Sequence, residues 1–396
     1  MGVVSAIGQG KQSFINALLN GESAFGLMQR PGRQRDTAFL GAEIAELLIP
    51  DSIPKQVLRS ASLSAKAALV VLQEAWDEAG LSGVDPDRIG LIVGGSNLQQ
   101  RELVQAHDAY RDRMAFLRPT YGVSFMDSDV CGFCTAQFGI RGMAFTVGGA
   151  SASGQLAVIQ AAQAVLSKQV DVCIAVGALM DLSYWECQGL RALGAMGSNR
   201  FAGEPSLACR PFDSDHDGFI FGECSGAIVI ESVESSQRRG IRPTAALVGW
   251  GIAMDGNRNP DPSLEGETRA IRGALKSAGW SGADVDYVNP HGTGSAIGDE
   301  TEVNALRACG LTGAYVNATK SLVGHGLSAA GAVEVIATLL QIQAGRLHPT
   351  RNLDEPIDPG LNWVGKSAIL HQIEKALTLS MGFGGINTAL CWQRPC

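Results

Sequence analysis

The chain has 396 residues, of which 45% are hydrophobic and 18% are charged, with 49 glycines and a formal net charge of −8. This composition is typical of a well-buried globular protein and excludes a disordered chain, and the negative charge disfavours a general nucleic-acid interface. We find no apolar run of about 18 residues that would predict a membrane span, and no basic and apolar regions typical of a signal peptide. The nine scattered cysteines are therefore expected to be reduced thiols in a cytoplasmic protein.

Helix and strand signals alternate along the first half of the chain. Residues 62–81, "SLSAKAALVVLQEAWDEAGL", predict a long amphipathic helix that ends at Gly80. Buried strands are predicted within residues 87–95, 170–178 and 226–233. This alternation predicts an α/β architecture in which helices cover the strands.

Residues 98–140 interrupt this pattern, because they are rich in charged residues, methionine and aromatic residues. We interpret them as an insertion that covers the core and a partner subunit. Within them, Cys131 and Cys134 form a C-x-x-C pair, but a zinc site usually needs a second pair at matching spacing. No such pair follows, so we predict core thiols one helical turn apart.

Residues 148–154, "GGASASG", are all Gly, Ala or Ser, and an apolar helical stretch follows to Leu166. Such a run lets another part of the backbone or a ligand approach closely. Ser151 and Ser153 place two hydroxyl groups at the start of this helix. The residues alone leave open whether one of them is a nucleophile or a helix cap.

The segment "DSDHDG", residues 213–218, resembles the start of a calcium-binding EF-hand loop. That loop needs a glutamate at its twelfth position, which is Cys224 here, and strand-like "FIF" occupies its second half. We therefore reject a calcium site and predict a turn that enters a strand.

Two of the six histidines lie where an open α/β sheet places ligand-binding groups. His291 follows a predicted strand, and His325 lies in a glycine-rich turn before a helix, with Lys320 five residues upstream. A single histidine in a turn is usually a surface or capping residue. Two histidines at similar turns, with a lysine beside one of them, indicate a functional site.

The sequence also contains a weak internal repeat. Two pairs of segments share one layout of strand, turn and helix: 85–97 with 282–295, and 145–166 with 315–340. Chance similarity between Gly- and Ala-rich segments is the alternative. We predict two related halves, residues 1–235 and 236–396.

Four blocks, taken together and in order, resemble the β-ketoacyl synthase family of the thiolase fold. They are "RPFDSDHDGFIFGECSGAIVIE", "NPHGTGSAIGD", "NATKSLVGHGLSAAGAVE" and "LSMGFGGINTAL". The resemblance implies a five-layered αβαβα fold made of two pseudo-repeated halves. It further implies a homodimer in which the strand near residues 143–147 pairs across the twofold axis, and it places the opening "MGVVSAIG" inside the family's first strand.

The resemblance assigns a role to the small-residue run. In the family this place holds a cysteine that takes the acyl chain as a thioester, whereas Ser151 stands there in this sequence and Ser153 falls on an ordinary small residue. A helix N-terminus lowers the pKa of a thiol from about 8.5. A serine hydroxyl stays protonated and needs an adjacent base. We therefore expect acyl transfer to Ser151 to be greatly weakened.

The remaining family chemistry needs no thiolate. A malonyl thioester on the phosphopantetheine arm of an acyl carrier protein loses CO₂, and the resulting enolate is protonated to an acetyl thioester. The resemblance implies that His291 and His325 donate hydrogen bonds to the enolate oxygen, and that Lys320 with Glu334 orders the site. It implies that the Thr293 and Ser295 hydroxyls bind the pantetheine. Further residues form the apolar wall and the gating loop: Phe219, Phe383 and Gly384. Met381 and Ile386 depart from the family's usual Phe and Thr near that loop.

These features resemble the free-standing serine-type ketosynthases of polyketide β-branching cassettes. The sequence therefore predicts a malonyl-acyl carrier protein decarboxylase that binds no metal and no resident cofactor. A condensing or acyl-transferring enzyme, with a natural serine or an engineered Cys-to-Ser change at Ser151, is one alternative. A non-catalytic partner subunit is another, although His291, His325 and Lys320 argue against it.

Overall fold

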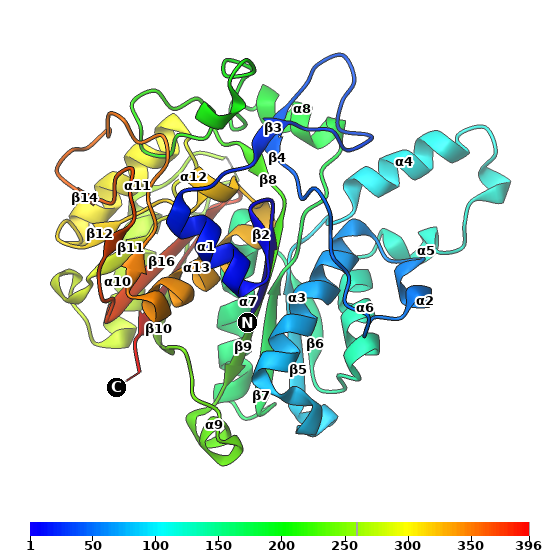
Figure 1. Cartoon of the computed structure of the whole chain (residues 1–396), viewed down its shortest axis with the longest axis horizontal. Helices are drawn as coiled ribbons and strands as arrows, with labels where there is room; N and C mark the ends of the chain where they lie inside the picture. Colours follow the sequence, from blue (N-terminus) through cyan, green and yellow to red (C-terminus); the bar gives the residue numbers. More distant parts are fainter. Residues whose placement is uncertain (259, 396) are drawn as a thin grey trace.

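The computed structural model describes residues 1–258 and 260–395, and its strands form two six-stranded sheets (Figure 1). The first sheet has the order β2 (Gly8–Gln9), β1 (Gly2–Ser5), β9 (Cys224–Glu231), β7 (Val172–Gly177), β5 (Ile89–Gly94) and β6 (Ala144–Val147). The second has the order β10 (Ala246–Met254), β17 (Ile386–Gln393), β16 (Lys375–Gly382), β11 (Tyr287–Asn289), β12 (Tyr315–Val316) and β14 (Asn362–Trp363). Two smaller sheets contain β3 (Phe25–Leu27), β4 (Leu40–Ala42) and β8 (Phe221–Gly222), and β13 (Arg346–Leu347) with β15 (Ile369–Leu370).

The two large sheets repeat one topology. The run β1-β9-β7-β5-β6 corresponds to the run β10-β17-β16-β11-β12. In each run the first two pairings are antiparallel and the next two are parallel. The weak repeat in the sequence is therefore a repeat in the structure.

Helices form the other layers of the fold. They are α1 (Lys11–Asn20), α2 (Lys55–Leu58), α3 (Leu63–Ala79), α4 (Gln100–Tyr110), α5 (Tyr121–Ser124), α6 (Ser128–Phe138), α7 (Ser153–Leu166), α8 (Tyr184–Ala192), α9 (Val233–Arg239), α10 (Leu264–Ala278), α11 (Ala296–Ala308), α12 (Lys320–Val323) and α13 (Ala330–Ala344). Helices α7 and α13 lie between the two large sheets, α3 and α6 cover the first sheet, and α10 covers the second with α11 beside it (Figure 1). This is the predicted αβαβα layering.

Local signals set the ends of the predicted helix α3. The Ser62 side chain accepts a hydrogen bond from the Ala65 amide at 3.0 Å, which satisfies one of the free donors at the helix start. Gly80 ends the helix with φ +59°, a conformation that favours glycine. The buried face of α3 packs on β1 and β9. The predicted end of this helix is thus confirmed.

Helices α7 and α13 pack unusually closely where they begin. A Cβ atom on Gly154 would lie 2.5 Å from the Ala332 amide nitrogen, and one on Gly331 would lie 2.9 Å from the Gln155 side chain. Glycine at both positions lets the backbones meet without side chains between them. The starts of the two helices, one from each half of the chain, therefore lie side by side.

Helix α13 corrects one expectation from the sequence. The segment Leu327–Ala344 is long and apolar enough, by length and composition, to cross a membrane, although we found no such run in the sequence. In the structure 89% of this segment is buried. A helix that is buried on nearly all sides is also what a central layer between two sheets requires, so α13 is explained as a core helix.

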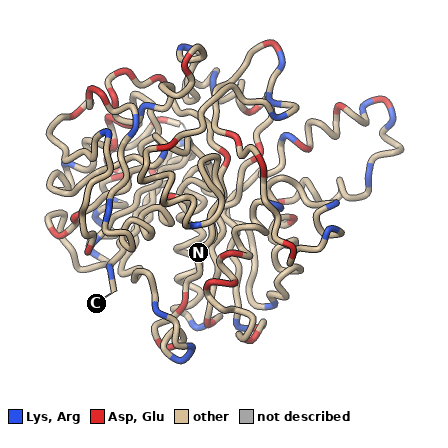
Figure 2. The backbone as a smooth tube through the Cα atoms, viewed as in Figure 1, with Lys and Arg blue, Asp and Glu red and all other residues tan. Residues whose placement is uncertain are grey.

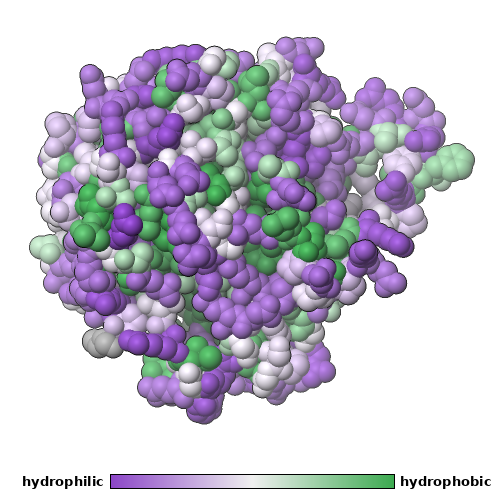
Figure 3. Space-filling model, in the orientation of Figure 1, coloured by the Kyte–Doolittle hydropathy of each residue, from purple (hydrophilic) through white to green (hydrophobic). Residues whose placement is uncertain are grey.

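The segment predicted as an insertion is helical and divides into two parts. Helix α6 packs on α3 and buries Cys131 and Cys134 in the core, as predicted for these thiols. Helix α4 buries no residue and stands away from the body as an arm (Figures 1 and 3). Charged residues follow α4 at the tip of the arm (Figure 2). The chain beyond them exposes several apolar residues: Met114, Phe116, Val123, Phe125 and Met126.

The close contact at Gly154 yields a test of the central layer. We expect Gly154→Ala to lower the free energy of unfolding by about 1–3 kcal/mol, because the added methyl group overpacks the crossing with α13. Gly132→Ala, in exposed α6 backbone with no atom near the new methyl group, is the matched control. It should be neutral or stabilise the protein by about 0.5–1 kcal/mol. Equal effects of the two changes in chemical denaturation would contradict the close packing.

Candidate active site

The two halves of the chain jointly line a cavity of about 530 Å³. Seven of the residues to which the sequence assigned a role line it: Ser151, Phe219, His291, Thr293, Ser295, His325 and Phe383. Lys320 and Glu334 are each 1% exposed and lie behind this wall, and Gly384 lies in the turn between β16 and β17. The structure thus brings the predicted residues to one place.

Ser151 lies in a single 3₁₀ turn, Ala150–Ala152, that leads directly into α7. Ala150 has φ +46°, a conformation that is uncommon for residues other than glycine. The Ser153 hydroxyl fixes this turn, since it accepts a hydrogen bond from the Gly149 amide at 2.9 Å and donates one to the Ala150 carbonyl at 2.7 Å. Ser153 is therefore the structural hydroxyl, and Ser151 is the one that faces the cavity.

The backbone of His325 is held by the strand segment next to it. Its amide donates to the Ile220 carbonyl at 2.7 Å, and its carbonyl accepts from the Gly222 amide at 3.1 Å. A Cβ atom on Gly222 would lie 1.9 Å from the Val323 carbonyl oxygen, so only glycine allows this approach. The Phe219 ring packs edge-on against the imidazole, with the two ring centroids 5.1 Å apart.

The hydrogen bonds of His325 determine where its proton lies. Its Nε2 atom is 2.9 Å from the Ser151 hydroxyl oxygen. Its Nδ1 atom is buried, and no residue of the described chain offers it a hydrogen-bond partner. A proton on Nδ1 would be a buried N–H without an acceptor, which is rarer than an unpaired acceptor. The favoured tautomer carries the proton on Nε2 and donates it to Ser151.

His291 is fixed through its backbone and through Lys320. The amides of His291 and Gly292 donate to the two carboxylate oxygens of Glu302 at 2.6 and 2.7 Å. The Lys320 ammonium donates to the His291 carbonyl and lies 3.5 Å from Nδ1. An ammonium group has donors only, so Nδ1 of His291 is the acceptor and the proton lies on Nε2. The two imidazole rings are 5.4 Å apart and nearly perpendicular.

Lys320 forms a buried ion pair with Glu334. Burial raises the pKa of Glu334 to about 7, although the Lys320 charge opposes this rise. The pKa of each active-site histidine is well below its ordinary value, first because of burial and then because of the Lys320 charge. Both imidazoles are therefore neutral hydrogen-bond donors near neutral pH.

The remaining predicted residues surround this pair. The Thr293 hydroxyl donates to the Ser295 hydroxyl at 3.1 Å, and both face the cavity. Phe383 is 43% exposed, and Gly384 beside it has φ +91°, so this turn depends on glycine. Met381 lines the cavity, whereas Ile386 pairs with Gly382 across the β16–β17 turn.

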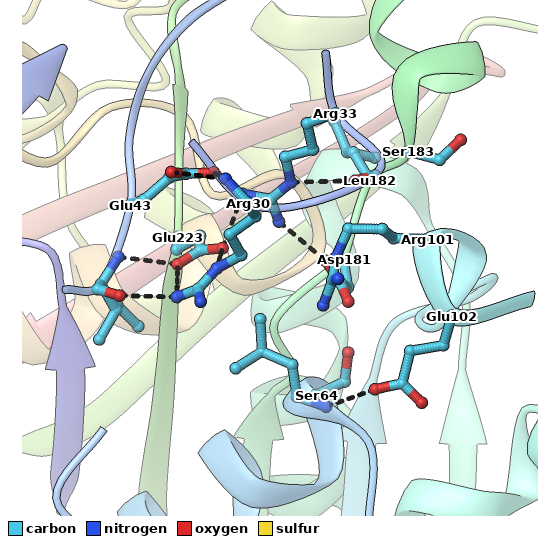
Figure 4. A network of polar contacts seen from close by, with 12 residues as sticks. Arg30, Arg33, Glu43, Ser64, Arg101, Glu102, Asp181, Leu182, Ser183 and Glu223 are labelled. Atoms are coloured by element: carbon cyan, nitrogen blue, oxygen red, sulfur yellow. Dashed lines mark hydrogen bonds and ion pairs between the residues drawn. The ribbon is translucent and has the colours of Figure 1, made fainter. Parts of the chain in front are cut away.

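A buried ionic network supports the strand that holds His325 (Figure 4). Arg33 is fully buried and pairs with Asp181 at 2.8 Å and with Glu43 and Glu223 at 2.7 Å each. Its guanidinium lies over the Phe221 ring at 5.2 Å, and Phe221 forms a β-bridge with His325. Breaking a buried pair leaves an uncompensated charge, which is strongly destabilising. This network therefore fixes the backbone behind the histidine.

The same network reaches the arm. Arg101, in the first turn of α4, pairs with Asp181 at 2.8 Å, and Arg30 pairs with Glu223 (Figure 4). Burial raises the pKa of Glu223, but the Arg30 hydrogen bond and the Arg33 charge lower it by more. The positive charges of three arginines in this network are thus balanced by the negative charges of three carboxylates: Arg30, Arg33 and Arg101 with Glu43, Asp181 and Glu223.

Our sequence interpretation missed several carboxylates of the site. Asp299 accepts hydrogen bonds from the Thr293 and Gly294 amides at 3.1 Å each, and Glu302 holds the His291 loop. The two carboxylates lie three residues apart in α11, the helix that directly follows the His291 block, and this spacing was a usable signal. Glu267 lines the cavity from α10, and no motif pointed to it. Arg33 likewise lies in an irregular segment without a motif.

The "DSDHDG" segment is a turn before β8, as predicted. Asp213 is fully buried, and its carboxylate accepts from the Asp354 and Glu355 amides at 2.7 and 2.8 Å and from the Arg210 side chain at 2.9 Å. Its oxygens are therefore occupied by the protein. Across residues 1–258 and 260–395 there is no group of three or more His, Cys, Asp or Glu residues that could hold a metal ion.

Comparisons with known proteins agree with this geometry. Residues 1–236 match the family "Beta-ketoacyl synthase, N-terminal domain", and residues 244–354 match "Beta-ketoacyl synthase, C-terminal domain". The polyketide biosynthesis malonyl-ACP decarboxylase PksF of Bacillus subtilis is 62% identical over 393 residues, which cover 99% of this chain and 95% of that protein.

Solved structures show the same relationship. A β-ketoacyl synthase from Burkholderia phymatum has a TM-score of 0.89 at 27% identity, covering 100% of this chain and 98% of that one. A type II polyketide synthase ketosynthase in complex with its acyl-carrier protein, AntDE:AntF, has a TM-score of 0.85 at 25% identity and covers 100% and 98%. By sequence and by fold, this chain belongs to the β-ketoacyl synthase family.

Proposed function

We propose that the protein is an enzyme that decarboxylates malonyl-acyl carrier protein to acetyl-acyl carrier protein in polyketide biosynthesis, and that it serves β-branching there. The 62% identity to a malonyl-ACP decarboxylase over almost the whole chain supports the reaction. The assembled cavity supports a catalytic role rather than that of an inactive partner subunit, because His291, His325 and Lys320 are in contact with one another or with Ser151.

One observation argues against a covalent acyl intermediate. A serine nucleophile needs a base that accepts its proton, and that base needs a third group to orient it. In this protein the Nδ1 atom of His325 has no hydrogen-bond partner among the described residues, and burial lowers the pKa of its imidazole well below the ordinary value. His325 therefore donates to Ser151 and does not activate it.

The same donors suit the decarboxylation step. When the bond between C2 and the malonyl carboxylate breaks, CO₂ leaves and the electron pair becomes an enolate with charge on the thioester oxygen. The Nε2–H groups of His291 and His325 would donate to that oxygen in place of the Ser151 hydroxyl. Donors aimed at developing charge are often the largest catalytic contribution, about 3–4 kcal/mol for one well-placed group.

The cavity walls suit the rest of the substrate. Phe219 is 3% exposed and presents an apolar surface beside His325, which disfavours the charged carboxylate and favours its loss as CO₂. The Thr293 and Ser295 hydroxyls would bind the pantetheine amides, and Phe383 with Gly384 would gate the entrance. The pantetheine arrives on the carrier protein, so the proposed reaction uses no resident cofactor or metal.

We further infer that two copies of the chain form a homodimer. Strand β6 is the edge of the first sheet, with Phe145 39% exposed, and an exposed edge can pair with a second strand. The apolar residues after α4 lie on the same half of the chain. The eight described cysteines are free thiols, which supports a cytoplasmic location for this enzyme.

The first test separates decarboxylation from condensation. Incubated with malonyl-acyl carrier protein and an acyl donor, the enzyme should release acetyl-acyl carrier protein and form no C–C bond, because Ser151 holds no acyl group. Intact-protein mass spectrometry should show no acyl adduct on the enzyme. A stoichiometric acyl-Ser151 species or a condensed product would contradict the proposal and favour the condensing alternative.

The second test restores the sulfur. We expect Ser151→Cys to react with thiol-directed inhibitors and to take up acyl groups, because the helix start lowers the thiol pKa. Leu190 and Leu193 line the same cavity as Ser151 and would give an acyl chain an apolar surface. Ser153→Cys is the control, since that side chain is buried and bonded to the turn. A folded Ser151→Cys protein that does not react would remove Ser151 from the nucleophile's position.

A further inference from the structure

The proposed decarboxylation needs a proton donor that the residues discussed so far do not supply. After CO₂ leaves, the enolate carbon must take up one proton to become the acetyl methyl group. His291 and His325 are neutral donors to the enolate oxygen, and Lys320 is buried behind them. The Ser151 hydroxyl is a weak acid. Other ionisable groups of the cavity wall are therefore the candidates for this donor.

Glu267 is a buried carboxyl group of that wall with no assigned role. It lies in the first turn of α10, is 2% exposed and lines the same cavity as Ser151, His291 and His325. Its Oε2 atom is buried and has no hydrogen-bond partner among the described residues. A buried unpaired carboxylate oxygen is costly unless the group is protonated.

The groups around Glu267 are acidic. From α11 it faces Glu302 and Asp299, and from the end of β10 it faces Asp255, which itself lies near Arg269 and Asn387. Gly266 makes room for this arrangement, because a Cβ atom there would collide with the Asp255 carboxylate. Glu302 already accepts from two backbone amides, which favours its charged form. The proton of the Glu267–Glu302 pair is therefore held by Glu267.

We propose that Glu267 is the acid that protonates the enolate carbon. The C2–carboxylate bond breaks, CO₂ departs and its electron pair remains on C2 as the enolate. The Glu267 O–H bond then breaks, its proton forms the new C–H bond, and the carboxylate that remains is reprotonated by water entering the cavity. This role rests on the proposed decarboxylase function.

The physical environment of the pair agrees with this role. Burial raises the pKa of Glu267 well above its ordinary value, and the charges of Glu302, Asp255 and Asp299 raise it further. Burial likewise raises the pKa of Glu302, against its two backbone hydrogen bonds. A general acid works best when its pKa is close to the working pH.

The test compares Glu267→Gln with Glu265→Gln, an exposed carboxylate two residues away on the same helix. Each protein is incubated with malonyl-acyl carrier protein in ¹³C-labelled bicarbonate buffer. Acetyl-acyl carrier protein and ¹³C in the remaining malonyl group are then measured by mass spectrometry. In Glu267→Gln no carboxyl group protonates the enolate, so the enolate persists long enough to recapture CO₂, which includes ¹³CO₂ from the buffer. We expect Glu267→Gln to form the acetyl product about 10²-fold more slowly and to raise the ratio of ¹³C exchange to product, whereas Glu265→Gln behaves like the wild type.

The pH profile of the wild type gives a second, independent result. Its rate should fall as the pH rises through the pKa of Glu267, and this fall should be absent in Glu267→Gln. An unchanged rate and exchange ratio in a folded Glu267→Gln protein, or a wild-type rate with no alkaline fall, would overturn the inference. A wild type that forms no acetyl product would instead overturn the proposed function and this inference with it.

Discussion

The buried ammonium group of Lys320 is the charge on which the active site depends. Glu334 neutralises it from α13, and the His291 carbonyl and Nδ1 accept its hydrogen bonds. Its charge lowers the pKa of both histidines beyond the effect of burial. The imidazoles are consequently neutral, and their Nε2 protons face the cavity. Removing either member of the Lys320–Glu334 pair would leave an unpaired charge in the core, where such charges cost the most.

The fold supplies this arrangement through its internal repeat. The 3₁₀ turns Ala150–Ala152 and Leu327–Ala329 occupy corresponding places before α7 and α13, and each begins with a residue of positive φ. One turn carries Ser151, and the other follows His325. Close packing of α7 on α13 brings the two turns together. The site is therefore a contact between the two halves, and neither half contains it alone. In the proposed mechanism, this contact supplies hydrogen-bond donors for the enolate and Ser151 does not act as a nucleophile.

Much of this could be predicted from the sequence, because glycine-bounded strands, the repeat and the four family blocks are local signals. From these signals the sequence predicted α3, β5, β7 and β9 where the structure has them. The structure also brings the predicted site residues together around Ser151. Long-range contacts left no such signal. Arg33 forms ion pairs with Asp181 and Glu223, which are far from it in the sequence of the first half. Glu267 in α10 likewise faces Glu302 in α11. Helix α13 was predicted as a helix, but the apolar run Leu327–Ala344 was not recognised as long enough to cross a membrane, and only its buried surroundings show that it is a core helix. Burial and pairing, which decide protonation, are properties of the folded chain.

The proposed function depends on His325 donating a hydrogen bond to Ser151 rather than acting as its base. The most direct test is the ¹⁵N NMR spectrum of histidine-labelled enzyme at neutral pH, with the His325 signals assigned by their loss in His325→Ala. We expect a neutral imidazole with its proton on Nε2 and none on Nδ1. A proton on Nδ1 with an unprotonated Nε2 facing the Ser151 hydroxyl would contradict it, because His325 could then accept the serine proton.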